Sequence, residues 1–191
     1  MSKRALLPVL MISLLLSACG TSAAEAERRL EAQRDALAAG TMSFTAFITA
    51  QPPSGEVFAC VLTCSATPEE TVVTVQKPEA VSGISATARR GETALRYGEV
   101  LLALGPEEAQ ADSPIGATVL LAEALRSGHI VRCWTERAGD ALLFAAELYV
   151  DDAHGLTVWF DADTLVPRHA SLLRGGAELL RCELQGYSSL G

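Results

Sequence analysis

The acidic side chains that could take part in catalysis or metal binding occur in two close pairs, Asp151-Asp152 and Asp161-x-Asp163. Paired carboxylates can work as general acid and base, or they can bind calcium. Both pairs lie in short segments between apolar runs, where an aspartate commonly bonds its own backbone and supports a turn. The calcium hypothesis also lacks the glycine and the distant glutamate of an EF-hand loop. We therefore expect both pairs to be turn residues.

The three histidines, His129, His154 and His169, are too scattered to suggest a metal or catalytic site. The chain contains no His-x-x-x-His and no His-Glu-x-x-His, the spacings that place two imidazoles on one helix face. A Gly-x-Ser-x-Gly nucleophile elbow and a phosphate-binding loop are also missing from the sequence. We expect solvated surface positions for all three histidines, and we predict no catalytic residue, metal site or cofactor.

Four cysteines follow residue 19: Cys60, Cys64, Cys133 and Cys182. In an exported protein an even number of cysteines permits disulfides, and four cysteines allow three pairings among which the sequence does not choose. Zinc is disfavoured because Cys60-x-x-x-Cys64 lies in a strand-like run without the tight turn of a zinc knuckle. The cysteines are therefore either buried apolar thiols or partners in one or two disulfides.

A further cysteine, Cys19, ends a segment with the features of an export signal. Lys3 and Arg4 precede an apolar run over residues 5–18, which is shorter than the roughly 20 residues of a membrane-spanning helix. Its end, Leu16-Ser17-Ala18-Cys19, resembles the lipobox of bacterial lipoproteins, in which the thiol receives diacylglycerol and signal peptidase II then cleaves before the cysteine. An ordinary signal peptide with a chance cysteine is the disfavoured alternative.

We therefore predict a signal peptide over residues 1–18 and lipidation of Cys19. Residues 19–22 would form the lipidated end and a short tether. The acyl chains would anchor the protein to the extracytoplasmic face of the cell membrane, because two chains hold firmly where one is marginal.

The composition indicates one folded domain over residues 23–191. Of the 191 residues, 49% are hydrophobic and 20% are charged, well away from disordered compositions. The formal net charge of −8 argues against nucleic acid and against an anionic membrane surface as electrostatic partners. Contact with the membrane is therefore expected through the lipid alone.

Two segments have helical patterns. Residues 21–39 carry Leu30 and Leu37 one heptad apart and stop at Gly40. The second helix begins at a Ser-Pro pair, residues 113–114, which supplies an N-cap and a proline at the first helical position. It ends at Gly128, and its apolar stripe consists of Ile115, Val119, Ala122 and Leu125.

The remaining segments alternate polar and apolar residues and are separated by short turns, which is typical of antiparallel neighbours. The fold class predicted is α+β: a curved antiparallel sheet of about ten or eleven strands forming an incomplete (half) β-barrel, with helices covering the concave side. The expected strands are 42–51, 57–64, 71–76, 84–89, 93–97, 100–104, 130–137, 141–150, 156–160, 166–174 and 177–187.

Four segments, in this order, resemble the LolA/LolB superfamily of lipoprotein-sorting proteins, and in particular its lipid-anchored Gram-positive members. They are Lys77-Pro78-Glu79-Ala80-Val81-Ser82-Gly83-Ile84, Ala94-Leu95-Arg96-Tyr97-Gly98-Glu99-Val100-Leu101, Ser113-Pro114 and Val158-Trp159-Phe160-Asp161-Ala162-Asp163-Thr164-Leu165-Val166-Pro167. The resemblance implies a half-barrel covered by helices, whose apolar concave face takes acyl chains or a protein partner. Relatives include GerS-type germination lipoproteins, which hold and activate a cell-wall amidase.

Large apolar residues at strand period are the candidates for the inward face. They would line either a ligand cavity or an ordinary packed core, and the core is favoured because such side chains usually fill a barrel. The candidates are Phe58, Leu62, Leu142, Phe144, Leu148, Val158 and Phe160.

Two functions follow as hypotheses. The first is a non-enzymatic lipoprotein that binds an apolar ligand, such as the acyl chains of a lipid or lipoprotein. The alternative is a scaffold or regulator of a cell-envelope protein, for example a cell-wall hydrolase in sporulation or germination. Dimerisation through a strand edge or a free thiol is compatible with either.

Overall fold

The computed structural model describes residues 23–50, 57–106 and 111–190. Within these ranges one sheet of eleven strands is accompanied by helices α2 (Ala23–Ala39) and α3 (Pro114–Ser127) and by the short 3-10 helix η1 (Glu79–Val81). The strands are β1 (Thr41–Ala50), β2 (Phe58–Ala66), β3 (Thr71–Lys77), β4 (Ser85–Arg89), β5 (Glu92–Tyr97), β6 (Val100–Pro106), β7 (His129–Ala138), β8 (Ala141–Tyr149), β9 (His154–Asp161), β10 (Pro167–Arg174) and β11 (Ala177–Leu190).

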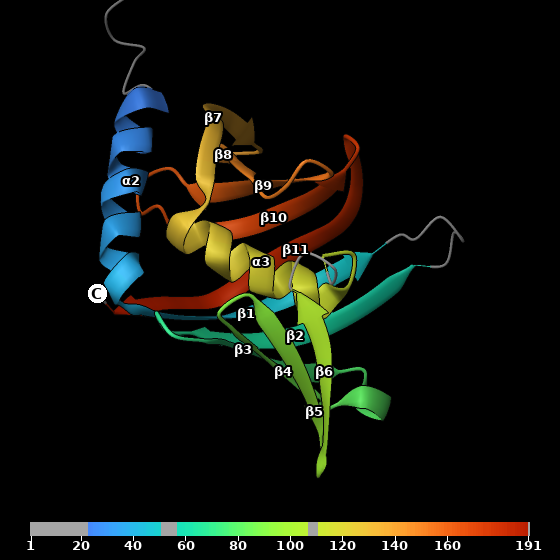
Figure 1. Cartoon of the computed structure of the whole chain (residues 1–191). Helices are drawn as coiled ribbons and strands as arrows, with labels where there is room; N and C mark the ends of the chain where they lie inside the picture. Colours follow the sequence, from blue (N-terminus) through green and yellow to red (C-terminus); the bar gives the residue numbers. More distant parts are fainter. Residues whose placement is uncertain (1–22, 51–56, 107–110, 191) are drawn as a thin grey trace, which may run out of the picture.

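The sheet is antiparallel throughout and has the order β6-β5-β4-β3-β2-β1-β11-β10-β9-β8-β7. Two meanders, β1 to β6 and β7 to β11, join where β1 pairs with β11. Helix α3 leads from one sheet edge, β6, to the other, β7, and the sheet curls around it (Figure 1). The predicted α+β half-barrel is confirmed.

Helix α3 lies inside the curve because nearly all of its surface is apolar. Nine of its residues are buried, including Val119, Leu121 and Leu125, as expected for a helix surrounded by other elements rather than resting on one face. Its predicted start is confirmed, since the Ser113 hydroxyl accepts a hydrogen bond from the Gly116 amide at 3.0 Å. At its end, a Cβ on Gly128 would lie 2.8 Å from the Ala124 carbonyl oxygen, so only glycine fits there without a shift.

The strands bury alternate residues, as a half-covered sheet must. On β1 the buried face consists of Met42, Phe44, Ala46 and Ile48. On β2 the buried positions are Cys60, Leu62, Cys64 and Ala66. These residues and the apolar surface of α3 form one continuous core.

Helix α2 stands beside the sheet, next to β7 and the C-terminal end of α3 (Figure 1). Leu30 and Leu37, predicted as its apolar seam, are both buried. Arg34 of α2 donates to the Gly128 carbonyl oxygen, and Arg29 donates to the Asp163 carbonyl oxygen at 2.5 Å. The helix is thus tied both to α3 and to the β9–β10 turn.

The predicted signal peptide, Cys19 and the tether lie outside the described residues. Between Ala23 and Leu190, in the ranges given above, no helix has the length and apolarity that crossing a bilayer would require.

Candidate ligand-binding groove

An apolar groove of about 210 Å³ opens at one end of the concave face, where β2, β3 and η1 approach the first turn of α3. Carbon-rich side chains form most of its wall, and the Ser113 hydroxyl and the Cys60 thiol are its polar side-chain groups. The lining residues are Phe58, Cys60, Leu62, Val75, Pro78, Val81, Ile84, Ser113, Pro114 and Ile115.

The groove has a buried floor and an exposed rim. Leu62 and Val75, at 1% and 5% exposure, form part of the floor and belong to the core. Phe58 and Val81, at 44% and 37% exposure, stand at the rim. An apolar ligand would therefore meet exposed side chains first and the end of the core beneath them.

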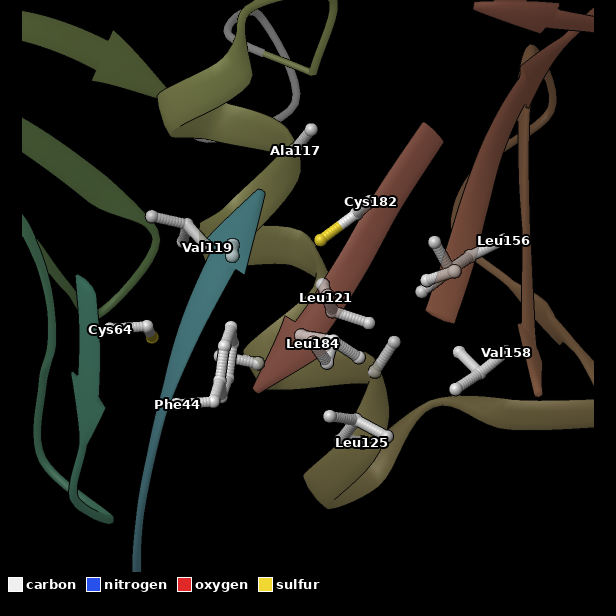
Figure 2. Packing of buried hydrophobic residues seen from close by; sticks show 14 of the residues in the cluster. Phe44, Cys64, Ala117, Val119, Leu121, Leu125, Leu156, Val158, Cys182 and Leu184 are labelled. Carbon is white, nitrogen blue, oxygen red and sulfur yellow. The ribbon is translucent and has the colours of Figure 1, made fainter. Parts of the chain in front are cut away.

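Beyond the groove the concave face is filled. Side chains of α3 such as Val119 and Leu121 lie between those of β1 and β2 on one side and those of β9 on the other (Figure 2). The space left between Leu121 and the facing strands is a seam of about 20 Å³, close to the minimum that holds one water molecule.

Five of the seven predicted inward residues are buried in this core: Leu62, Phe144, Leu148, Val158 and Phe160. Phe144 and Phe160 pack ring against ring, with centroids 6.0 Å apart. Phe58 lines the groove rim. Leu142 is 48% exposed, so it lies outside the enclosed part of the concave face, near the turn that joins β7 to β8.

Thus Phe58 and Leu62 reach the groove, whereas the other predicted residues do not line it. Sequence reasoning missed the contribution of β3 and η1, whose Val75 and Val81 complete the lining. Ile115 belongs to the apolar stripe of α3 and also lines the groove. The apolar pattern of the helix does not indicate that Ile115 faces the groove rather than the core.

A larger cavity of about 520 Å³ lies at the opposite end of α3. Its charged lining consists of Glu69, Glu70, Arg89, Arg90, Glu123 and Arg126. Arg89 pairs with Glu70 at 2.6 Å, and Arg126 donates to the Thr67 carbonyl oxygen. This cavity is a polar cleft between balanced charges and is unsuited to an apolar ligand.

The four cysteines within the described residues are thiols, three of them buried and Cys133 half-buried. Ile48 pairs with Cys182 on one side and with Cys60 on the other, so these two cysteines lie two strands apart, roughly 9–10 Å. A bridge between them would require backbone movement, because bonded cysteines have Cα atoms within about 7 Å. Burial raises the pKa of Cys60 to about 11 and that of Cys182 to about 12, which makes both poor nucleophiles.

The aspartate pairs lie in turns, as predicted. Asp151 Oδ1 accepts from the amides of Ala153 and His154 at 2.7 and 2.8 Å. Asp161 Oδ1 accepts from the Thr164 amide at 3.0 Å. Hydrogen bonds from the Thr164 amide and hydroxyl, together with Arg168, lower the pKa of Asp161 to about 2.

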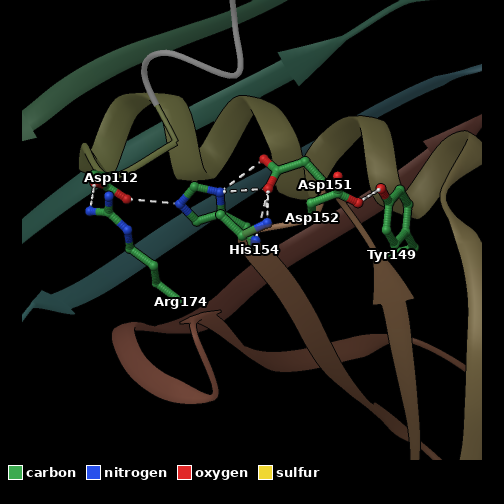
Figure 3. Close-up of polar contacts among 7 residues, drawn as sticks. Asp112, Tyr149, Asp151, Asp152, His154 and Arg174 are labelled. Carbon is green, nitrogen blue, oxygen red and sulfur yellow. Dashed lines mark hydrogen bonds and ion pairs between the residues drawn. The ribbon is translucent and has the colours of Figure 1, made fainter.

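The prediction for His154 is wrong. Its side chain is 10% exposed and lies between two carboxylates, with Nδ1 2.8 Å from Asp151 Oδ2 and Nε2 2.9 Å from Asp112 Oδ1 (Figure 3). Burial alone would lower the pKa of His154, but the hydrogen bonds to Asp112 and Asp151 outweigh it and raise that pKa. Asp112 lies 42 positions earlier in the chain, so the turn sequence around His154 carries no sign of it.

The other two histidines differ from each other. His129 is exposed at the start of β7, as predicted. His169 is partly buried and stacks on Trp159 with ring centroids 4.5 Å apart. Among the residues described, no three His, Cys, Asp or Glu side chains gather in a way that could hold a metal ion.

Comparison with known proteins finds similar folds among solved structures but no match at the level of sequence. No protein-family profile and no curated protein sequence matches the chain. Among solved structures, it resembles a putative outer membrane lipoprotein-sorting protein domain from Vibrio parahaemolyticus, with a TM-score of 0.53 and 11% identity over 86% of this chain and 93% of the other.

An uncharacterized conserved protein from Thermus thermophilus also has a TM-score of 0.53, with 8% identity over 86% of this chain and 88% of that one. A LolA superfamily protein from Nitrosomonas europaea matches with a TM-score of 0.48 and 10% identity, over 85% and 92% of the two chains. The chain shares the fold of the Vibrio and Thermus proteins. At such low identity the likeness extends to the fold alone.

Proposed function

We propose that this protein is a non-catalytic, lipid-anchored member of the LolA/LolB superfamily that binds the acyl chains of a lipid or lipoprotein. The observation that carries the proposal is the apolar groove between β2, β3, η1 and the first turn of α3. In the groove, side chains of the core meet exposed apolar side chains, and its polar side-chain groups are the Ser113 hydroxyl and the Cys60 thiol, whose pKa is raised to about 11 by burial.

The size of the groove defines what it can hold. A cavity of about 150 Å³ lined by aliphatic side chains accommodates a molecule as large as benzene, and pockets for complete drug-sized ligands measure about 300–1,000 Å³. At about 210 Å³, the groove accepts the end of one acyl chain. A whole chain requires α3 to move away from the sheet, starting at its first turn.

The proposed site of action is the extracytoplasmic face of the cell membrane, with the protein held by the lipid on Cys19. The lipobox-like segment before Cys19 supports this location. Replacing Cys19 by alanine should abolish incorporation of a palmitate analogue, and continued labelling would contradict the anchor.

Native mass spectrometry followed by solvent extraction tests the ligand. We expect the chain from residue 19 onward, with Cys19→Ala, to carry or take up fatty acid or phospholipid that is released with a stoichiometric loss of mass. Ile115→Arg should abolish uptake by placing a charge in the groove, whereas Val131→Arg, on an exposed position of β7, serves as the control. A protein that takes up no added lipid would contradict the proposal.

A second candidate function is a scaffold or regulator for a cell-envelope protein. It is favoured by the filled concave face and by the edge strand β6, on which Val100, Leu101 and Leu102 are 67%, 65% and 55% exposed. An exposed apolar edge is suited to strand pairing with another chain. Photo-crosslinking from position 101 in cells would capture such a partner, and Leu101→Lys should abolish the crosslink.

A further inference from the structure

The His154 cluster is attached directly to the groove. Asp112 immediately precedes Ser113, Pro114 and Ile115, which form one wall of the groove at the start of α3. Two cationic or potentially cationic side chains from the far half of the sheet hold Asp112: His154 of β9 and Arg174 of β10 (Figure 3). The start of the helix that fills the half-barrel is thus fastened to the opposite wall.

With both carboxylates ionised, the contacts of His154 are fully satisfied only by the charged imidazolium. Each ring nitrogen of His154 lies within 3.0 Å of a carboxylate oxygen. Nδ1 faces Asp151, and Nε2 faces Asp112. A neutral imidazole has one N–H and can donate to one of these carboxylates, while its other nitrogen would oppose the remaining carboxylate lone pair against lone pair. The protonated ring donates to both, so the clasp is complete only in that state.

We propose that His154 is a pH-dependent latch, which when protonated fixes the first turn of α3 in its place beside the groove and when neutral releases it, so that the groove can widen for ligand entry. The consequence for ligand entry rests on the proposed function. The latch itself rests only on the contacts of His154 and on the position of Asp112 at the start of the helix.

The other charged or titratable groups of the cluster are Asp112, Asp151, Asp152, Arg174 and Tyr149. The pKa of Asp151 is lowered because the bonds from His154 and from two amides outweigh its burial, and Arg174 forms an ion pair with Asp112. Asp152 accepts a hydrogen bond from the Tyr149 hydroxyl at 3.0 Å, which raises the pKa of Tyr149 and keeps that phenol neutral.

The direction of the pH effect follows from the raised pKa of His154. A group with a raised pKa in the folded state contributes its full stabilisation below its unfolded value, about 6.5 for histidine, and loses it as the pH rises through the folded value. The latch is therefore closed in mild acid. It opens as the pH rises through the pKa of His154, which lies above the ordinary histidine pKa of about 6.5. The ion pair of Arg174 with Asp112 is a second contact on the same carboxylate.

Two readouts on the chain from residue 19 onward, with Cys19→Ala, test the latch. The first is hydrogen exchange of the amides in residues 113–118, corrected for intrinsic rates. The second is binding of Nile red, a neutral apolar probe whose own charge does not change with pH. Both should increase with pH in the wild type, the affinity by about fivefold, the lower end of the usual coupling between linked sites.

His154→Gln should remove the pH dependence and hold both readouts near their high-pH values, because glutamine stays neutral. His129→Gln, at an exposed position of β7, is the matched control and should titrate like the wild type. Helix exchange that is independent of pH in the wild type would overturn the latch, even if His154→Gln failed to fold. Probe binding that is absent at every pH, with exchange still dependent on pH, would contradict the proposed function and leave the latch standing.

Discussion

Phe144 and Phe58 are both predicted from the sequence to face inward, but their replacement by alanine should reduce folding stability by very different amounts. Phe144 is fully buried and packs on Phe160, whereas Phe58 is 44% exposed at the groove rim. Phe→Ala in a packed core costs about 3–5 kcal/mol, from lost transfer free energy and the cavity left behind. About half of the Phe58 side chain remains in water, so Phe58→Ala should cost about 1 kcal/mol.

In a domain of this size each kcal/mol lowers Tm by roughly 2–4 °C. Phe144→Ala should therefore lower Tm by roughly 6–20 °C, and Phe58→Ala by roughly 2–4 °C. The same two variants should reverse their order in ligand binding. Phe58→Ala removes part of the groove lining and should weaken Nile red binding, whereas any folded Phe144→Ala should retain the groove.

Urea denaturation followed by circular dichroism measures the free energy of unfolding, and a parallel titration with Nile red measures binding. Equal destabilisation by the two substitutions would refute the division into filled core and open rim. A loss below about 1 kcal/mol for Phe144→Ala would show that the concave face is an open cavity rather than a packed core.

The pKa of the turn carboxylate Asp161 is lowered to about 2, chiefly by the Thr164 amide. Asp161 therefore contributes to folding stability above about pH 4, and this contribution is lost as the pH falls toward 2. Asp161→Asn should lower Tm at neutral pH and flatten this acid limb in a calorimetric series, and an unchanged limb would contradict the assignment. Iodoacetamide at about pH 8 should alkylate half-buried Cys133 before the three buried cysteines, and all four in urea. Resistance to alkylation in urea without reductant would reveal disulfides. Gly128→Ala should destabilise the domain by about 1–3 kcal/mol, since its Cβ would meet a backbone carbonyl at 2.8 Å. Gly155→Ala, which meets nothing within 4 Å, is the control and should stay within about 0.5 kcal/mol.

The arrangement of strands and turns could be predicted from the sequence because each depends on neighbours along the chain. Alternation of polar and apolar residues indicates which face of a strand is buried. Two-residue turns such as Gly175-Gly176, both with positive φ, dictate antiparallel pairing of the strands they connect. All strands expected from these signals occur in the sheet, and most ends agree within two residues; β11 runs three residues beyond its expected end at residue 187.

The enclosed region could not be predicted in the same way. Alternation assigns Leu142 and Phe144 to one strand face, but it does not say how far along the strand the covering helix extends. Leu142 is half exposed and Phe144 is fully buried for that reason. The environment of His154 cannot be predicted for a related reason, because its partner Asp112 is brought to it by the packing of α3 and is not a neighbour in the turn.

Under the proposed function, helix α3 occupies the space that a whole acyl chain would need, so binding would exchange one apolar occupant for another. Exposing Val119, Leu120, Leu121 and Leu125 at about 1.5–3 kcal/mol each would cost roughly 6–12 kcal/mol. Burying an acyl chain of about 15 methylenes at about 0.8 kcal/mol each contributes roughly 12 kcal/mol. Since the two quantities are similar, full displacement of α3 without ligand should be rare, and displacement with ligand should be nearly balanced. Contacts of modest strength at the first turn of α3, including the clasp of His154 on Asp112, can then decide whether the exchange begins.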